Sequence, residues 1–161
     1  MAFEVTRSLR ARAAPLPAKL MVSACEAPHV RTLGRRLHEL DDTGLTAALR
    51  KLNGTSEQVL NNQELMHLVL PAIRADFAMN AEYAYRPQPP LHVPMVVFAG
   101  EDDAHVEIGR VRQWDALTQV ACGFHALPGG HFFIDTQRPM FMSLLKPLLL
   151  ALAADVKFNQ R

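Results

Sequence analysis

The segment from Pro94 to Phe133 constrains the fold more than any other part of the chain. Pro94 to Ala99 is a short apolar run ended by Gly100, which is typical of a strand covered on both faces of a sheet. Val106 to Leu117 then has the apolar spacing of an amphipathic helix, and Phe124 to Leu127 forms a second short strand. A strand, a helix and a strand in this order predict two parallel neighbouring strands.

Residues that can carry chemistry follow both predicted strands. Glu101-Asp102-Asp103 comes directly after the first strand, and His131 comes after the second. The turn before His131 is Pro128-Gly129-Gly130, whose glycines allow the backbone to reverse sharply. Because the carboxyl ends of parallel strands meet at one edge of a sheet, where ligands bind in open α/β sheets, we expect an acid and a histidine to lie together there.

These motifs resemble the last third of an α/β-hydrolase and, more narrowly, a type II thioesterase. The motif G-x-x-D-x-x-V is present as Gly100, Asp103 and Val106, and a Gly-Gly-His-Phe-Phe run spans Gly129 to Phe133. The resemblance implies a partial α/β-hydrolase fold of about three parallel strands with flanking helices. It also implies a helical lid insertion at about residues 33–86, and a single domain over residues 1–161 that forms the C-terminal part of a thioesterase domain.

The resemblance assigns roles to two residues. It implies that His131 accepts the proton of a nucleophile, and that Asp103 fixes the tautomer of the imidazole and stabilises its positive charge. Asp103 falls on the fourth position of the motif, which favours it over its neighbour. The other candidates in this region are Asp102, His105, His125 and Asp135.

The nucleophile that this chemistry requires is missing from the sequence. In this fold it lies in a G-x-S-x-G turn, and the chain order is Ser, then Asp, then His. Residues 1–7 resemble the helix that follows this turn, so we expect the polypeptide to begin just after the serine and to hydrolyse thioesters at or near background by itself. The residues that lack flanking glycines at the required spacing are Ser8, Ser23, Ser56, Ser143, Cys25 and Cys122.

Composition excludes several other classes of protein. The net charge of +1 and the absence of a basic cluster argue against a nucleic-acid surface. Apolar runs stay short of the roughly 20 residues of a membrane span, and the polar segment Met1–Ala14 is no signal peptide, so we expect a cytoplasmic protein. We expect no cofactor and no metal, because the acids and histidines around Asp103 lack the spacing of a metal site.

The resemblance further implies a substrate and partners. Type II thioesterases edit acyl groups that are linked through phosphopantetheine to an acyl or peptidyl carrier protein in polyketide and non-ribosomal peptide synthesis. The alternative is a non-catalytic remnant that still binds carrier proteins. Within residues 33–86, Asp42 or Thr43 is expected to cap a helix. Apolar residues of this segment either line an acyl pocket or make ordinary contacts between helices: Met66, Val69, Ile73, Phe77 and Met79.

Overall fold

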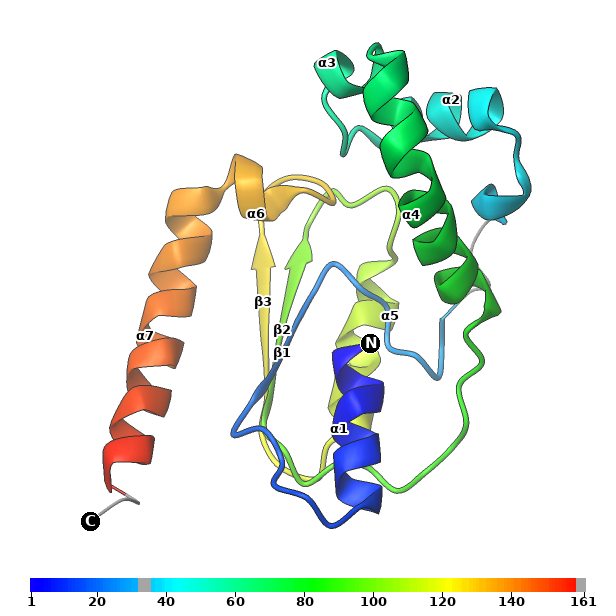
Figure 1. Cartoon of the computed structure of the whole chain (residues 1–161). Coiled ribbons are helices and arrows are strands. Elements are labelled where there is room, and N and C mark those ends of the chain that lie inside the picture. The colour runs from blue at the N-terminus through cyan, green and yellow to red at the C-terminus, as the bar shows by residue number, and fades with distance from the viewer. Residues whose placement is uncertain (32–35, 159–161) are drawn as a thin grey trace. The chain divides into compact units, whose positions relative to one another are not determined.

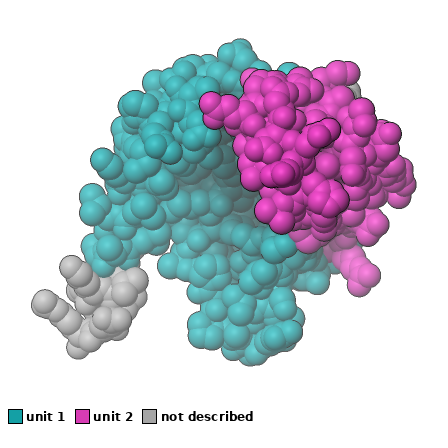
Figure 2. All heavy atoms as spheres, turned by 45° about the horizontal axis from the view of Figure 1, so that its top comes forward, with its two compact units in different colours: residues 1–31, 87–161 teal, residues 32–86 magenta. Residues whose placement is uncertain are grey.

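The computed structural model describes residues 1–31 and 36–158, with side chains up to residue 154. The chain divides into two compact units, of which the first comprises residues 1–31 and 87–161 and the second residues 32–86 (Figure 2). The expectation of one domain over the whole chain stays a prediction.

The first unit is built on a three-stranded parallel sheet. Its strands are β1 (Leu20–Ser23), β2 (Met95–Gly100) and β3 (Cys122–Leu127), in the spatial order β1-β2-β3. Every residue of the central strand β2 is buried, which explains why this strand is apolar throughout rather than alternating. The predicted α/β fold with three parallel strands is confirmed.

Helices cover both faces of this sheet (Figure 1). On one face lie α1 (Ala2–Ala11), α5 (Ile108–Arg112) and the 3₁₀ helix η2 (Gln113–Leu117). The short helix α6 (Phe133–Thr136) leads into α7 (Arg138–Phe158), which covers the opposite face.

Aromatic contacts mark the two packed layers. On the face of α1, the rings of Phe3 and Trp114 meet edge to face at 5.3 Å. On the face of α7, Phe98 of β2 meets Phe141 edge to face at 5.2 Å. Offset and edge-to-face pairs of this kind stabilise a core beyond the area that they bury. The sheet is therefore fixed from both sides, and its carboxyl edge provides a rigid base for the loops that follow the strands.

The single helix expected over Val106–Leu117 is two elements instead. It starts later, at Ile108, and changes to 3₁₀ geometry at Gln113. Val111, Trp114 and Leu117 are all buried, and they are three residues apart. A 3₁₀ helix has three residues per turn, so this geometry places residues of that spacing on one face, where a regular α-helix would rotate Leu117 away.

The second unit is helical. It contains η1 (Leu37–Glu39), α2 (Asp42–Leu52), α3 (Glu57–Leu60) and α4 (Gln63–Glu82). The residue that caps α2 is Asp41, whose side chain accepts a hydrogen bond from the backbone N–H of Gly44 at 2.7 Å, so the prediction of Asp42 or Thr43 was wrong by at least one residue. The start expected for this segment, at residue 33, lies outside the described residues. The core of this helical unit consists of Leu45, Leu49, Leu60, Met66 and Leu70.

No helix within residues 1–31 and 36–158 is both long enough and apolar enough to cross a membrane.

Candidate active site

Two loops at the carboxyl edge of the sheet form the candidate site. The first follows β2 and carries Asp103, and the second follows β3 and carries His131. Backbone hydrogen bonds join the loops: Glu101 N–H donates to the carbonyl of Leu127 at 2.9 Å, and Asp102 N–H donates to that of Gly129 at 3.0 Å. The two loops are thus held side by side before any side chain is considered.

The carboxylate of Asp103 is bonded to the ring of His131. Its Oδ2 lies 2.8 Å from Nδ1 of His131. An ionised carboxylate only accepts hydrogen bonds, so this contact places the proton of the neutral ring on Nδ1 and leaves Nε2 as the basic nitrogen. Among the described residues, none is hydrogen-bonded to Nε2. The pair therefore presents an oriented imidazole whose second nitrogen is available to accept a proton.

The other oxygen of Asp103 holds the loop itself. Oδ1 accepts the backbone N–H of His105 at 2.8 Å and that of Val106 at 3.2 Å. This is an Asx turn, in which an aspartate side chain takes the place of a backbone carbonyl. The side chain of Asp103 is only 4% exposed, whereas that of His131 is 31% exposed. The carboxylate of Asp103 is therefore fixed and enclosed, whereas the ring of His131 is partly exposed to solvent.

Two further rings flank His131. His105 meets it edge to face at 5.4 Å, and Phe132 does so at 5.3 Å. The sequence assigned no role to Phe132. The hydrogen bond to Asp103 and these two rings together restrict the orientation of the imidazole. The placement of His105 next to His131 could have been expected from the sequence, because an aspartate two residues before His105 is typical of an Asx turn.

The other candidate acids and histidines make different contacts. Asp102 is exposed and bonds to the histidine loop through its backbone, and His105 contacts Asp103 through its backbone N–H and not its ring. His125 stacks on Phe98 with a centroid distance of 5.3 Å. Asp135 is exposed and forms an ion pair with Arg138 at 3.8 Å. Only Asp103 and His131 thus meet as the sequence predicted, while their catalytic role stays a prediction.

A nucleophile for this pair is not found in the part of the chain that the structure describes. None of the serines in that part is hydrogen-bonded to His131; Ser143 donates to the carbonyl of Met140, and the buried hydroxyl of Ser23 has no partner there. Burial raises the pKa of both thiols, with Arg31 opposing the effect at Cys25 and Asp115 adding to it at Cys122. A raised pKa disfavours the thiolate, which is the nucleophilic form.

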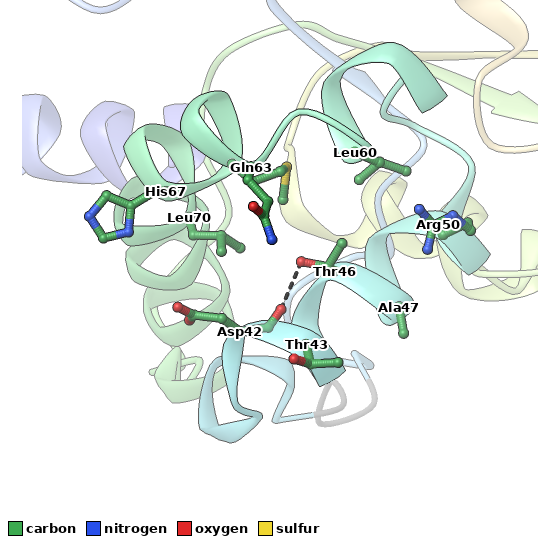
Figure 3. A pocket seen from close by; sticks show the side chains of 10 residues that line it. Asp42, Thr43, Thr46, Ala47, Arg50, Leu60, Gln63, His67 and Leu70 are labelled. Carbon is green, nitrogen blue, oxygen red and sulfur yellow. Dashed lines mark hydrogen bonds between the residues drawn. The ribbon is translucent and has the colours of Figure 1, made fainter.

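Two observations bear on ligands. Within the described residues, no group of three or more histidine, cysteine, aspartate or glutamate side chains is arranged to hold a metal ion. The helical unit contains an open pocket of about 560 Å³ between α2, α3 and α4 (Figure 3). Its apolar lining includes Leu60, Met66 and Leu70, and its polar lining includes Asp42, Arg50 and Gln63.

The charged residues of this pocket are already paired. Arg50 bonds to Glu57 at 3.0 Å, and Asp42 bonds to Arg74 at 2.6 Å. The lining of the pocket therefore combines apolar side chains with charged side chains whose charges are neutralised by ion pairs.

Of the five residues proposed to line an acyl pocket, only Met66 lies in this one. The core of the helical unit is packed by Val69, Ile73 and Phe77, and Met79 is 51% exposed. Val69, Ile73 and Phe77 are partly buried against that core, and contacts between helices explain their burial.

The fold and the paired side chains define a class of protein. Parallel strands that deliver an acid and then a histidine to one edge of a sheet, in that chain order, are the arrangement of the α/β-hydrolases. The family model described as "Thioesterase domain" matches residues 1–149. The chain belongs to this family.

Two similar proteins are named as a thioesterase and as a protein of gramicidin S biosynthesis. The chain is 36% identical over 137 residues to Thioesterase PikA5 of Streptomyces venezuelae, covering 85% of this chain and 48% of that protein. It is 32% identical over 157 residues to the gramicidin S biosynthesis protein GrsT of Aneurinibacillus migulanus, covering 97% of this chain and 61% of that protein.

A solved structure with the same fold is that of the type II thioesterase BorB from the borrelidin biosynthetic cluster. The TM-score is 0.79 at 36% identity, and the match covers 91% of this chain and 59% of that one. The predicted kinship with type II thioesterases is confirmed. The chain spans about half to three fifths of the length of these relatives.

Proposed function

We propose that Asp103 and His131 are the acid and the base of a type II thioesterase. The observation that carries the proposal is the 2.8 Å contact between Asp103 Oδ2 and His131 Nδ1, at the edge of the sheet where this fold places its reactive groups. The substrate class is an acyl group held as a thioester on an acyl or peptidyl carrier protein, as in polyketide and non-ribosomal peptide synthesis. The proposed location is the cytoplasm.

The chemistry follows from the two nitrogens of the ring. Nε2 of His131 accepts the proton of an attacking hydroxyl, and the resulting imidazolium is stabilised by the Asp103 carboxylate at Nδ1. The same Nε2–H then donates the proton to the departing thiolate. Asp103 stays ionised throughout and fixes the tautomer that leaves Nε2 basic.

The described residues supply the acid and the base of this reaction but no hydroxyl within reach of the base. A nucleophile has to come from outside residues 1–31 and 36–158, or from water. Water activated by His131 alone is a poor substitute, since removal of one member of a catalytic triad costs several orders of magnitude in rate. We therefore propose that the 161-residue polypeptide alone hydrolyses thioesters at or near background.

The second candidate function is carrier-protein binding without catalysis. What favours it is the same lack of a serine or cysteine bonded to His131 in the described part of the chain. In that case the chain binds a carrier protein but does not hydrolyse the thioester.

One experiment separates these functions. The 161-residue chain, H131A and D103N are each tested for hydrolysis of an acyl-loaded carrier protein, for labelling by a fluorophosphonate, and for binding to the same carrier protein. Binding without labelling or turnover, unchanged in H131A, agrees with the expected lack of activity and supports the second function for the 161-residue chain. Turnover and labelling that H131A abolishes support the thioesterase and refute the expected lack of activity. Turnover that H131A leaves unchanged contradicts the assigned site.

A further inference from the structure

The last residue of β2, Gly100, lies against the turn that precedes His131. Gly100 is buried and pairs with Leu127 across the sheet. A Cβ atom built on it would lie 2.6 Å from the carbonyl oxygen of Gly129 and 3.0 Å from the carbonyl carbon of Gly130, and closer still to the oxygen of Gly130. These obstacles are backbone atoms, so no side-chain rotation relieves the contact.

The obstructing carbonyls are also fixed in place. That of Gly129 accepts the N–H of Asp102 at 3.0 Å, and that of Gly130 accepts the N–H of Phe133 at 3.1 Å. A methyl group at Gly100 would therefore have to push the turn away from the strand and strain both hydrogen bonds. His131 follows the turn directly, and Asp103 follows Asp102 directly, so this displacement acts on the distance between them.

The other glycines of the sheet and its loops show that this close approach is specific to Gly100. A Cβ on Gly123, within β3, would meet Val96 Cγ2 at 3.7 Å, and one on Gly130 would meet the carbonyl oxygen of Asp102 at 3.7 Å. Both are ordinary van der Waals distances. Gly129 is required for another reason, since its φ of +101° lies in the region that glycine alone occupies at little cost.

We propose that Gly100 is a positioning residue of the Asp103–His131 pair. The lack of a side chain at this position sets the spacing of the two loops, and this spacing allows the 2.8 Å contact between Asp103 and His131. Hydrogen bonds weaken steeply once donor and acceptor separate, so a shift of the turn by about 1 Å removes the contact. The importance of this spacing for hydrolysis rests on the proposed function, whereas the spacing itself does not.

The test measures the hydrogen bond directly by NMR of the full chain labelled with ¹⁵N-histidine. The wild type is expected to show a slowly exchanging Nδ1–H proton on His131 and the Nδ1–H tautomer. D103N identifies this signal by abolishing it. G100A is expected to lose the signal and to give a mixture of both tautomers, while its amide spectrum stays dispersed.

G123A and G130A are the matched controls, since each adds the same methyl group where there is room for it. Both are expected to keep the wild-type signal. A G100A variant that retains the signal and the tautomer overturns the proposal. Loss of the signal in either control, or a G100A chain without a dispersed spectrum, also overturns it, because Gly100 would then serve the fold in general. Since no hydrolysis is measured, a failure of the proposed function leaves this result unaffected.

Discussion

Asp103 and His131 are hydrogen-bonded to each other at 2.8 Å, yet the acid is enclosed at 4% exposure while the base is 31% exposed. The two oxygens of Asp103 bind different partners. Oδ2 binds the imidazole, and Oδ1 binds the backbone N–H groups of His105 and Val106. The carboxylate is thus a structural part of its loop as well as the partner of the histidine.

This arrangement predicts unequal costs for two substitutions. D103A leaves two backbone N–H groups and the imidazole without their acceptor, and we expect the free energy of unfolding to fall by about 2–3 kcal/mol. D103N keeps a carbonyl oxygen for the loop, so we expect a loss of only about 1 kcal/mol. Urea denaturation followed by circular dichroism measures both. D102A, at an exposed neighbour, serves as the control and should change stability by less than about 0.5 kcal/mol. Equal losses in D103A and D103N would contradict the double role of the carboxylate.

Ala24 offers a stabilising substitution directly after β1. Its φ of +47° lies in the left-handed region, which costs a residue with a Cβ about 1–2 kcal/mol. A24G removes this strain but adds about 0.5–1 kcal/mol of backbone entropy in the unfolded chain. We expect a net gain of up to about 1.5 kcal/mol in the free energy of unfolding, measured by urea denaturation. The matched control is A47G in α2, where the same change should cost about 1 kcal/mol. A loss of stability in A24G would show that its backbone is not strained.

Burial of the Cys25 thiol predicts that the free energy of unfolding decreases at alkaline pH. Although Cys25 is exposed as a residue, surrounding protein raises the pKa of its thiol, and Arg31 opposes this only in part. Because the pKa is higher in the folded chain, the thiol stabilises the fold below its unfolded pKa of about 8.5, and this contribution is lost as pH rises through the folded pKa. We therefore expect the pH midpoint of iodoacetamide alkylation at Cys25 to lie above that of a cysteine peptide. C122S isolates the Cys25 reaction, and a midpoint below that of a cysteine peptide would refute the direction.

Arg74 joins the start of the helical unit to α4. Its guanidinium donates to the carbonyls of His38 and Leu40 and to the carboxylate of Asp42. A lysine has no fork with which to bridge three acceptors, so we expect R74K to destabilise this unit by about 1–2 kcal/mol. Hydrogen exchange of the α2 amides measures the effect. The matched control is R50K, whose exposed contacts with Glu57 and Asn61 predict a change below about 0.5 kcal/mol. Equal protection in R74K and the wild type would refute the bridging role.

The sequence allowed the order and the parallel pairing of the strands to be predicted, because β2 is a short apolar run with clear ends. The less apolar strand β3 starts at Cys122, two residues before the expected start at Phe124. The pairing of Asp103 with His131 followed from motif order, and the structure places the two side chains in contact. The helix ends were harder to predict. Asp41 and Asp42 are chemically identical candidates for the cap of α2, and only the backbone geometry selects Asp41.

Three further features depend on tertiary packing and not on local sequence. The change from α to 3₁₀ geometry at Gln113 is favoured by the burial of Trp114 and Leu117 against the sheet. The approach of Gly100 to the histidine turn depends on how two loops meet, which no spacing within either loop reveals. The pocket in the helical unit also arises only once α2, α3 and α4 are packed together.

The Asx turn at Asp103 leaves this position little freedom to vary during evolution. Asparagine preserves the local bend but offers the imidazole an amide, and glutamate restores the charge on an arm one methylene too long for the bend. A lineage that no longer needed the reaction would still be under selection to keep an aspartate or asparagine there, for the sake of the loop. An aspartate at this position in a homologue is therefore only a weak indication that the homologue is still an enzyme.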